Sequence, residues 1–390
     1  MKHLVIAVKT TDGGLWILPH VLEARRRGTK VTVLTPAGDG RLVRAVRNLS
    51  SHDSGVGHQA SPFDFSFRRP WRALRGLWRL RGTIRDLAPT IVLYHLYASA
   101  LAVRIACLGL RLRRVHMVAG PLYLESRIIR LVERLLGRLD DLIICGSEYT
   151  RRRYLGLGFP PCRLVTVPYG VDVAQFTPDR APDHLAVRRR LGVMPHSFVV
   201  GMVSYVYAPK SLVHRGEGIK GHRYLLRAWR RFRQRHPDAE LLLVGSGFDA
   251  AGEAYRQQLM TEHGVAPDAA ETAGVRWLST VADVREAYAA MDVSVSPSLS
   301  DNHGAVLEAS AMAVPSIVSD AGALPEAVTS ESGWVFPAGS TEALLDRLEQ
   351  AYADWAEGSL APRGRAARTY VRAQFDVAEL SRRVISCLDE

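Results

Sequence analysis

The chain has 390 residues, which is long for a single hydrophobic core, so two domains are expected. Its composition, 47% hydrophobic and 23% charged, is ordinary for a folded globular protein and argues against a disordered chain. The net charge of +12 would attract phosphates, anionic lipid or nucleic acid, but no recognition helix, zinc finger or aromatic RNA motif is present, so no nucleic-acid partner is expected.

The sequence predicts neither a signal peptide nor a membrane span. The apolar run at residues 2–10 is too short for a signal peptide, and no small-residue cleavage site follows it. No apolar run reaches the roughly 18 to 20 residues that cross a bilayer. Four cysteines lack metal-type spacing and lie in apolar contexts: Cys107, Cys145, Cys162 and Cys387. Free thiols and a cytoplasmic location are therefore expected.

The first 36 residues predict a β–loop–α–β unit. Residues 2–10 and 30–36 read as buried strands, and residues 15–28 read as a helix that Gly28 ends. This order is typical of a parallel sheet. The turn Asp12-Gly13-Gly14 follows the first strand, where open α/β sheets bind ligands and where glycine allows close approach to a phosphate or sugar. A plain tight turn is the alternative reading.

The remainder of the first half continues to alternate. Residues 37–62 read as a loop with one short helical piece. Residues 71–89 carry a helical apolar stripe and an arginine face, and this face is either solvated or in contact with a membrane surface, such as the inner face of the membrane. Further strands are expected at 90–98 (ending at His95), 113–121, 140–147 and 163–172, with helices up to 137 and at 148–158.

A polar segment with one helix, residues 177–197, reads as a linker, after which the alternation restarts. Strands are expected at 198–207, 239–247, 274–279, 292–298, 315–320 and 333–339. Helices are expected at 221–237, 255–264, 284–291, 304–313, 341–355 and 365–390. The pattern predicts an α/β protein with two Rossmann-like domains, and the last helix is long enough to return to the first domain.

Residues 296–328 contain the most specific local pattern. A strand, a polar loop and a helix start follow one another, and a helix N-terminus offers backbone N–H groups and a positive dipole end to an anion. Asp301 is placed in the loop and Glu308 in the second helical turn. Carboxylates accept strong hydrogen bonds from sugar and ribose hydroxyls. The stretch therefore predicts a sugar-nucleotide site.

Over nearly its whole length the chain resembles the retaining glycosyltransferases of family 4. The motifs that carry the resemblance are the turn at 12–14, YGVD at 169–172 with Phe176, IKGH at 219–222, LLLVGSG at 241–247 and the 296–328 stretch. The resemblance implies the GT-B architecture, with two Rossmann-like domains facing a central cleft. We expect an acceptor-binding domain at 1–176 with helix 366–390, and a nucleotide-sugar domain at 177–365.

The paired-acid motif departs from that family in its spacing. The family usually has seven residues between two glutamates, whereas six lie between Asp301 and Glu308. Ser300 has the usual spacing and is the alternative first position. Asp301 is preferred because a carboxylate serves sugar hydroxyls and a loop residue tolerates a shift. By resemblance, Glu308 would hold the ribose and Asp301 the donor sugar.

The resemblance also implies groups that bind the diphosphate. Backbone N–H groups of Gly304, Ala305 and Val306 would face it, and Lys220 would neutralise it. The family's arginine after the first strand of this domain is absent, because Ser204 stands there. Arg215 is one substitute and Lys210 is the other; Lys210 and Lys220 are two of the chain's five lysines. A solvated charged loop is the alternative.

Other site residues follow from the same resemblance. His303 lies in the acidic loop, and the nucleobase is expected near Arg276 and Trp277, unless Trp277 only packs in the core. His95 is assigned to the acceptor pocket or to a structural role. The histidine that the family commonly has before Gly120 is replaced by Ala119. Asp12 is the side chain proposed as general base.

Together these features predict transfer of a sugar from a UDP- or GDP-sugar to a hydroxyl of a glycan, a lipid-linked acceptor or a small secondary metabolite. Helix dipole and cations would replace a metal, so no metal or other cofactor is expected, and the nucleotide sugar is a co-substrate. Two alternatives stay open: a nucleotide-sugar epimerase of the same architecture, and a non-catalytic partner that binds the nucleotide sugar.

Overall fold

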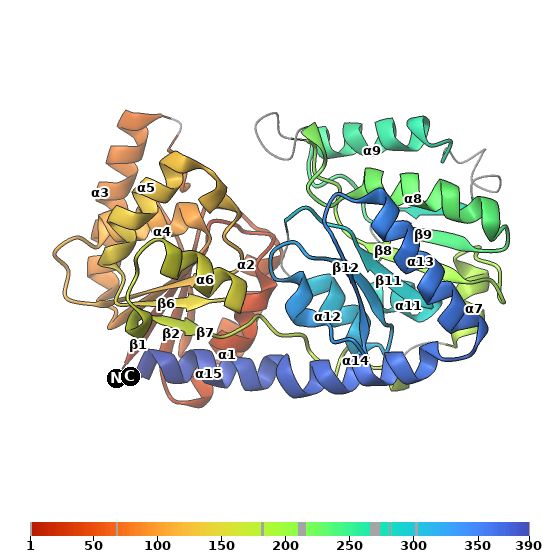
Figure 1. Ribbon diagram of the computed structural model, residues 1–390. Helices are drawn as coiled ribbons and strands as arrows, with labels where there is room; N and C mark the ends of the chain where they lie inside the picture. The colour runs from red at the N-terminus through yellow and green to blue at the C-terminus, as the bar shows by residue number, and fades with distance from the viewer. Residues whose placement is uncertain are drawn as a thin grey trace. The chain divides into compact units, whose positions relative to one another are not determined.

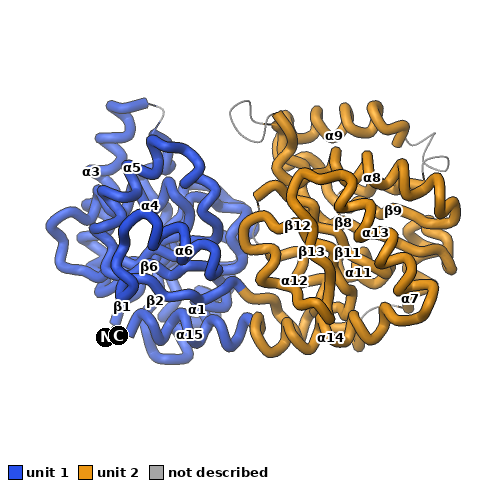
Figure 2. The backbone as a smooth tube through the Cα atoms, in the orientation of Figure 1, with its two compact units in different colours: residues 1–169, 377–390 blue, residues 170–376 orange. Residues whose placement is uncertain are grey.

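The computed structural model describes most of the chain, namely residues 2–67, 69–180, 183–209, 216–265, 274–279, 281, 283–300 and 303–389. The chain forms two compact units, shown in Figure 2: unit 1 comprises Met1–Tyr169 and Val377–Glu390, and unit 2 comprises Gly170–Asp376. Each is an α/β unit with one parallel sheet, as the alternating pattern predicted. Within the described part of the chain, no helix is both long enough and apolar enough to span a bilayer.

The sheet of unit 1 has seven parallel strands in the order β3-β2-β1-β4-β5-β6-β7. The strands are β1 (His3–Ala7), β2 (Lys30–Thr35), β3 (Val56–Ala60), β4 (Ile91–His95), β5 (Arg113–Val118), β6 (Leu142–Cys145) and β7 (Leu164–Thr166). The central strands β1 and β4 are buried at every residue because helices cover both faces of the sheet. The strand order reverses between β1 and β4, which is where such sheets bind ligands.

The helices of unit 1 connect these strands. They are α1 (Leu18–Arg26), α2 (Arg41–His52), α3 (Pro70–Leu87), α4 (Tyr97–Ala106), α5 (Arg127–Leu136), α6 (Glu148–Gly156) and α15 (Val377–Asp389). Short 3-10 turns are η1 (Leu15–Ile17), η2 (Leu122–Glu125), η3 (Gly137–Leu139) and η4 (Pro161–Arg163). Right-handed crossovers place α3 to α6 on one face and α1 and α2 on the other. Helix α15 packs against α1, as expected for the returning helix.

Two stretches of unit 1 differ from the sequence prediction. Residues 37–62 form the helix α2 and the strand β3, not a loop with a short helical piece. The strand β3 lies at the edge of the sheet and buries only Val56, so it lacks the apolar run of a central strand. The helix α4 was not predicted, because it is buried on most sides and therefore shows no single apolar stripe.

The sheet of unit 2 has six parallel strands in the order β10-β9-β8-β11-β12-β13 (Figure 1). The strands are β8 (Val199–Val203), β9 (Glu240–Val244), β10 (Val275–Leu278), β11 (Val293–Ser296), β12 (Ser316–Ser319) and β13 (Gly333–Phe336). The helices are α7 (His184–Arg190), α8 (His222–Arg235), α9 (Ala250–Glu262), α11 (Val284–Ala290), α12 (Gly304–Ala311), α13 (Thr341–Ala356) and α14 (Leu360–Gln374). Here the strand order reverses between β8 and β11. The carboxyl ends of these two strands are where such sheets bind ligands, and they are called the ligand edge of unit 2.

The C-terminal part is two helices, whereas the sequence predicted one helix over 365–390. The break between the two helices lies at Phe375 and Asp376. Asp376 forms an isolated parallel β-bridge with Val171, and both residues belong to unit 2. Helix α14 packs on α12 so closely that a Cβ on Gly364 would lie 2.1 Å from the Ala313 carbonyl oxygen. The division of the chain therefore falls at 169/170 and 376/377, whereas the sequence placed it at 176/177 and 365/366.

Candidate functional site

Unit 2 contains a cavity of about 230 Å³ at the carboxyl ends of β8 and β11, where the strand order reverses. Its walls come from these two strand ends, the start of α12 and one lysine. The lining residues are Met202, Val203, Ser204, Lys220, Ser294, Val295, Ser296, Ser298, Gly304, Ala305 and Val306. The structure thus brings together Lys220 and the three residues that the sequence assigned to a diphosphate.

The helix α12 begins at Gly304, with His303 as its N-cap, and Leu307 N–H donates to the His303 carbonyl oxygen at 2.9 Å. The N–H groups of the first turn have no partner within a helix, and they carry the positive end of its dipole. No acidic side chain lies in the first turn. The cavity therefore receives partial positive charge from the backbone as well as the charge of the lysine.

Backbone geometry fixes the position of Lys220. The N–H of Leu299 donates to the Ile219 carbonyl oxygen at 2.8 Å, which ties the loop before α8 to the loop before α12. The next residue, Gly221, has a φ of +74°, and a Cβ there would lie 2.0 Å from the Pro297 carbonyl oxygen. Only glycine fits this turn, so the chain is forced to present Lys220 at the strand ends.

A buried histidine lies behind this lysine. His222 stacks on Trp277 with ring centroids 5.5 Å apart, and the Trp277 indole donates to the Gly245 carbonyl oxygen at 3.1 Å. Burial, helped by the charge of Lys220, lowers the pKa of His222 to about 3. The imidazole is therefore neutral at ordinary pH, and it contributes packing, not charge, to the site.

Glu308 lies in the second turn of α12, as predicted, but it is not among the residues that line the cavity. The Tyr288 hydroxyl donates to its Oε2 at 2.8 Å and lies 3.2 Å from the Ala305 carbonyl oxygen. Burial raises the pKa of Glu308, and the bond from Tyr288 opposes that shift. Tyr288 thus holds the acid in place; nothing in the sequence distinguished it from an ordinary core tyrosine.

The other residues predicted to bind the donor either do not line the cavity or lie outside the described part of the chain. His303 is fully buried, and the centroid of its ring lies 5.2 Å from that of the Phe375 ring. Arg276 does not line the cavity; its guanidinium lies against Gly192, with Nε 3.4 Å from Glu240 Oε2. The remaining three predicted residues lie outside the described part of the chain: Asp301, Lys210 and Arg215.

In unit 1 the turn after β1 is tightly built. Gly14 has a φ of +90°, and Gly13 N–H donates to the Thr10 hydroxyl at 3.2 Å. Asp12 accepts hydrogen bonds from the Arg41 guanidinium at 2.9 Å and from the Arg41 N–H at 3.1 Å. These bonds lower the pKa of Asp12, which makes it a weaker base. The geometry favours a role in fixing the start of α2 over the predicted role of general base.

His95 ends β4 and is fully buried. Its Nδ1 lies 3.0 Å from the Tyr169 hydroxyl. Its ring is stacked with that of His20, and the two ring centroids are 6.4 Å apart. Its Nε2 has no hydrogen-bond partner among the described residues, and burial keeps the pKa of His95 well below its usual value. The next residue, Leu96, has a φ of +68°, a strained conformation of the kind that gathers at ligand sites. His20 was not identified from the sequence.

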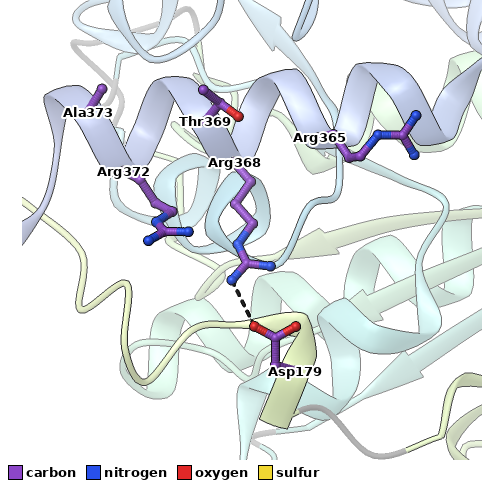
Figure 3. A pocket seen from close by; sticks show the side chains of 6 residues that line it. All are labelled: Asp179, Arg365, Arg368, Thr369, Arg372 and Ala373. Carbon is purple, nitrogen blue, oxygen red and sulfur yellow. Dashed lines mark hydrogen bonds and ion pairs between the residues drawn. The ribbon is translucent and has the colours of Figure 1, made fainter.

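A larger cavity, about 660 Å³, lies on the outer side of α14. Figure 3 shows Arg365, Arg368 and Arg372 along this helix, with Arg368 reaching Asp179 at 3.0 Å. Arg368 also donates to the Thr177 hydroxyl at 2.8 Å. Among the described residues that line this cavity, none lies at a strand end or in the first turn of an α-helix, and the central arginine fastens residues 177–179 to α14. We therefore place the candidate site at β8, β11 and α12.

Two models of known families match the chain. "Glycosyltransferase Family 4" matches residues 20–175, and "Glycosyl transferases group 1" matches residues 210–354. Together they cover both units. The chain belongs to the glycosyltransferases of family 4.

Solved GT-B glycosyltransferases share the whole fold of this family 4 member. A glycosyltransferase from Rickettsia africae superposes with a TM-score of 0.79 at 16% identity, covering 99% of this chain and 97% of its own. The Anabaena protein HepE, solved in complex with UDP-glucose, superposes with a TM-score of 0.78 at 18% identity and full coverage of both chains. At these identities the likeness establishes the fold.

Curated relatives within the family are similar over part of their length. A GDP-mannose-dependent monoacylated alpha-(1-6)-phosphatidylinositol monomannoside mannosyltransferase from Corynebacterium glutamicum is 28% identical over 65% of this chain and 64% of its own. A D-inositol 3-phosphate glycosyltransferase from Corynebacterium jeikeium is 31% identical over 52% of this chain and 46% of its own. The matches thus span about half to two thirds of these relatives.

Proposed function

We propose that this family 4 chain is a retaining glycosyltransferase that moves a sugar from a nucleotide-diphosphate sugar to an acceptor hydroxyl. One observation carries the proposal: Lys220 and the first turn of α12 meet in a single cavity at the ligand edge of unit 2. That combination supplies preorganised positive charge where negative charge develops on a departing diphosphate.

Each group has a distinct role in the proposed reaction. Lys220 and the N–H groups of Gly304 and Ala305 stabilise the leaving diphosphate. Glu308, held by Tyr288, binds the ribose hydroxyls of the donor. The departing phosphate accepts the acceptor's proton on the same face of the sugar, so the anomeric configuration is retained. No metal ion has a role in this scheme.

The donor is a UDP- or GDP-sugar, and the acceptor is a glycan, a lipid-linked sugar or a small polyol. The C. glutamicum relative is named for GDP-mannose and a phosphatidylinositol mannoside, and HepE was solved with UDP-glucose. These names support both nucleotide bases, and they favour acceptors that carry inositol or lipid. Two buried cysteines, Cys107 and Cys145, are not in disulfides, which supports a reducing, cytoplasmic location.

The test is a transfer assay with matched readouts. The chain is incubated with UDP-glucose, GDP-mannose and related donors, with and without inositol phosphate, phosphatidylinositol and oligosaccharide acceptors. We expect release of nucleoside diphosphate that depends on an acceptor, and a product whose anomeric proton coupling matches the donor. Isomerised donor sugar without an acceptor would instead identify an epimerase. Nucleotide binding with no turnover across the panel would identify a non-catalytic partner.

A further inference from the structure

The helix α5 buries an acidic side chain and exposes an apolar stripe. All of α5 lies in the described part of the chain, and its only buried side chain is that of Glu133. Ile128, Leu131 and Leu135 are exposed, the first to 76%, and their spacing puts them on one stripe. A surface helix normally buries its apolar stripe against the core. The outward stripe of α5 therefore needs another explanation.

A buried charge network, together with half-buried apolar side chains, anchors α5 to unit 1. The Arg104 guanidinium donates to both oxygens of Glu133, at 2.6 and 2.9 Å, and also to Asp140 at 2.6 Å. The Tyr154 hydroxyl donates to Glu133 at 2.6 Å. Arg104, Glu133 and Asp140 are fully buried. Because these inward contacts hold the helix, its exposed apolar residues are left for contacts outside the unit.

The helix α3 presents a second stripe of the same kind. Its inner face, including Leu80 and Ile84, is buried in the core. Its outer face exposes Trp71 to 84%, Trp78 to 76%, and Leu74 between them. The spacing i, i+3, i+7 repeats that of α5. Two tryptophans this exposed are unusual on a surface that meets only water, because each leaves a large apolar area unburied.

Arginines flank both stripes. On α3 each exposed apolar residue is followed directly by an arginine, and on α5 each is preceded directly by one. These arginines are Arg72, Arg75, Arg79, Arg127, Arg130 and Arg134. Within the described ranges, none of the six forms an ion pair with a carboxylate. The only acid on α5 is the buried Glu133, so the outer faces carry unbalanced positive charge beside apolar side chains.

Topology places the two stripes on one side of unit 1. The crossovers through α3, α4 and α5 all run in the same direction along the sheet, so these helices lie on the same face. Helix α4 contacts both, through its packing against α3 and through Arg104 to Glu133. Figure 1 shows α3, α4 and α5 above the sheet of unit 1, with α15 on the other side. Both stripes start near the carboxyl edge of the sheet, where His95 ends β4.

We propose that α3 and α5 form a docking surface, the α3–α5 surface, for an anionic lipid bilayer. Tryptophan and leucine enter the headgroup boundary, and arginines keep their charge at lipid phosphates while their stems cover apolar surface. A second copy of this chain is disfavoured as the occupant, because it would bring two positive surfaces together. The proposal concerns unit 1 alone and is independent of the sugar transfer, so vesicle binding can succeed or fail without any donor or acceptor.

The test is co-sedimentation of the full chain with vesicles of phosphatidylcholine alone and of phosphatidylcholine mixed with phosphatidylglycerol. We expect binding to the mixed vesicles, weakened by high salt. Arg72→Gln with Arg75→Gln should weaken it about 30-fold, since each arginine near such a surface contributes about fivefold. Ile128→Ser with Leu135→Ser should weaken it independently on the second helix.

The matched controls lie outside this surface. Arg227→Gln with Arg230→Gln removes the same charge from the exposed side of α8 in unit 2, and Leu22→Ser removes an exposed leucine from α1. Both should bind vesicles as the wild type does. Absence of binding to anionic vesicles would overturn the proposal. So would equal losses in the controls, or a dimer in solution that Trp71→Ala dissociates while vesicle binding stays unchanged.

Discussion

Replacement of Lys220 by alanine should remove most of the positive charge that the described residues supply to the cavity. The lysine contributes one charge, and the N-terminus of α12 contributes about half a charge. Lys220→Ala therefore removes about two thirds of it. Because removal of one preorganised group at a developing oxyanion typically lowers kcat by about 10²–10³-fold, we expect a loss in that range.

The assay measures initial rates of nucleoside diphosphate release over a range of donor concentrations. Lys220→Arg should retain much of the activity, since it keeps the charge. Lys30→Ala is the matched control, because Lys30 is exposed at the start of β2 in unit 1. The loss expected for such a group is far larger than about twofold. A kcat for Lys220→Ala within about a factor of two of wild type would therefore refute the reasoning. An equal loss in Lys30→Ala would refute it as well.

Three further predictions concern the groups around the two sites. Burial raises the pKa of Asp140 from 3.8 to about 6, so the folded state holds its proton more tightly, and the contribution of this group to the free energy of unfolding should fall by on the order of 3 kcal/mol as pH rises from about 4 to about 6. Urea titrations should therefore show the stability of the wild type, relative to that of Asp140→Asn, falling over this range, and parallel curves would contradict it. Tyr288→Phe removes the bond to Glu308 and should raise the donor KM about 3- to 10-fold with less change in kcat; an unchanged KM would argue against ribose binding by Glu308. Gly221→Ala should lower the free energy of unfolding by more than about 1 kcal/mol, measured in urea, because φ is +74° and the carbonyl oxygen nearby leaves no room; wild-type stability would contradict this.

The alternation of strands and helices could be predicted because buried parallel strands are continuously apolar. The edge strand β3 and the helix α4 could not, since one has little apolar character and the other shows no single apolar stripe. Residues 365–390 read as one helix because nothing at Phe375 and Asp376 breaks helical propensity; their packing breaks it.

The residues of the site divide in the same way, into those with a signal in the local sequence and those that only long-range packing brings into place. Lys220 could be placed because the IKGH motif resembles that of the family, and the start of α12 could be placed because a strand–loop–helix pattern is a local signal. Tyr288 and His20 could not, because long-range packing alone brings them to Glu308 and His95. Arg276 was assigned to the nucleobase, but its charge is directed to Glu240 across the neighbouring strand, which sequence spacing does not reveal.

The central claim is that the cavity at β8, β11 and α12 binds the diphosphate of a nucleotide sugar. Isothermal titration calorimetry with UDP, GDP, uridine and guanosine tests it most directly. The account predicts that at least one diphosphate binds, that its nucleoside binds far more weakly, and that Lys220→Ala weakens the diphosphate Kd about tenfold or more, while Lys30→Ala leaves it unchanged. Equal affinity for nucleoside and diphosphate, or a diphosphate Kd that Lys220→Ala leaves unaltered, would contradict the account.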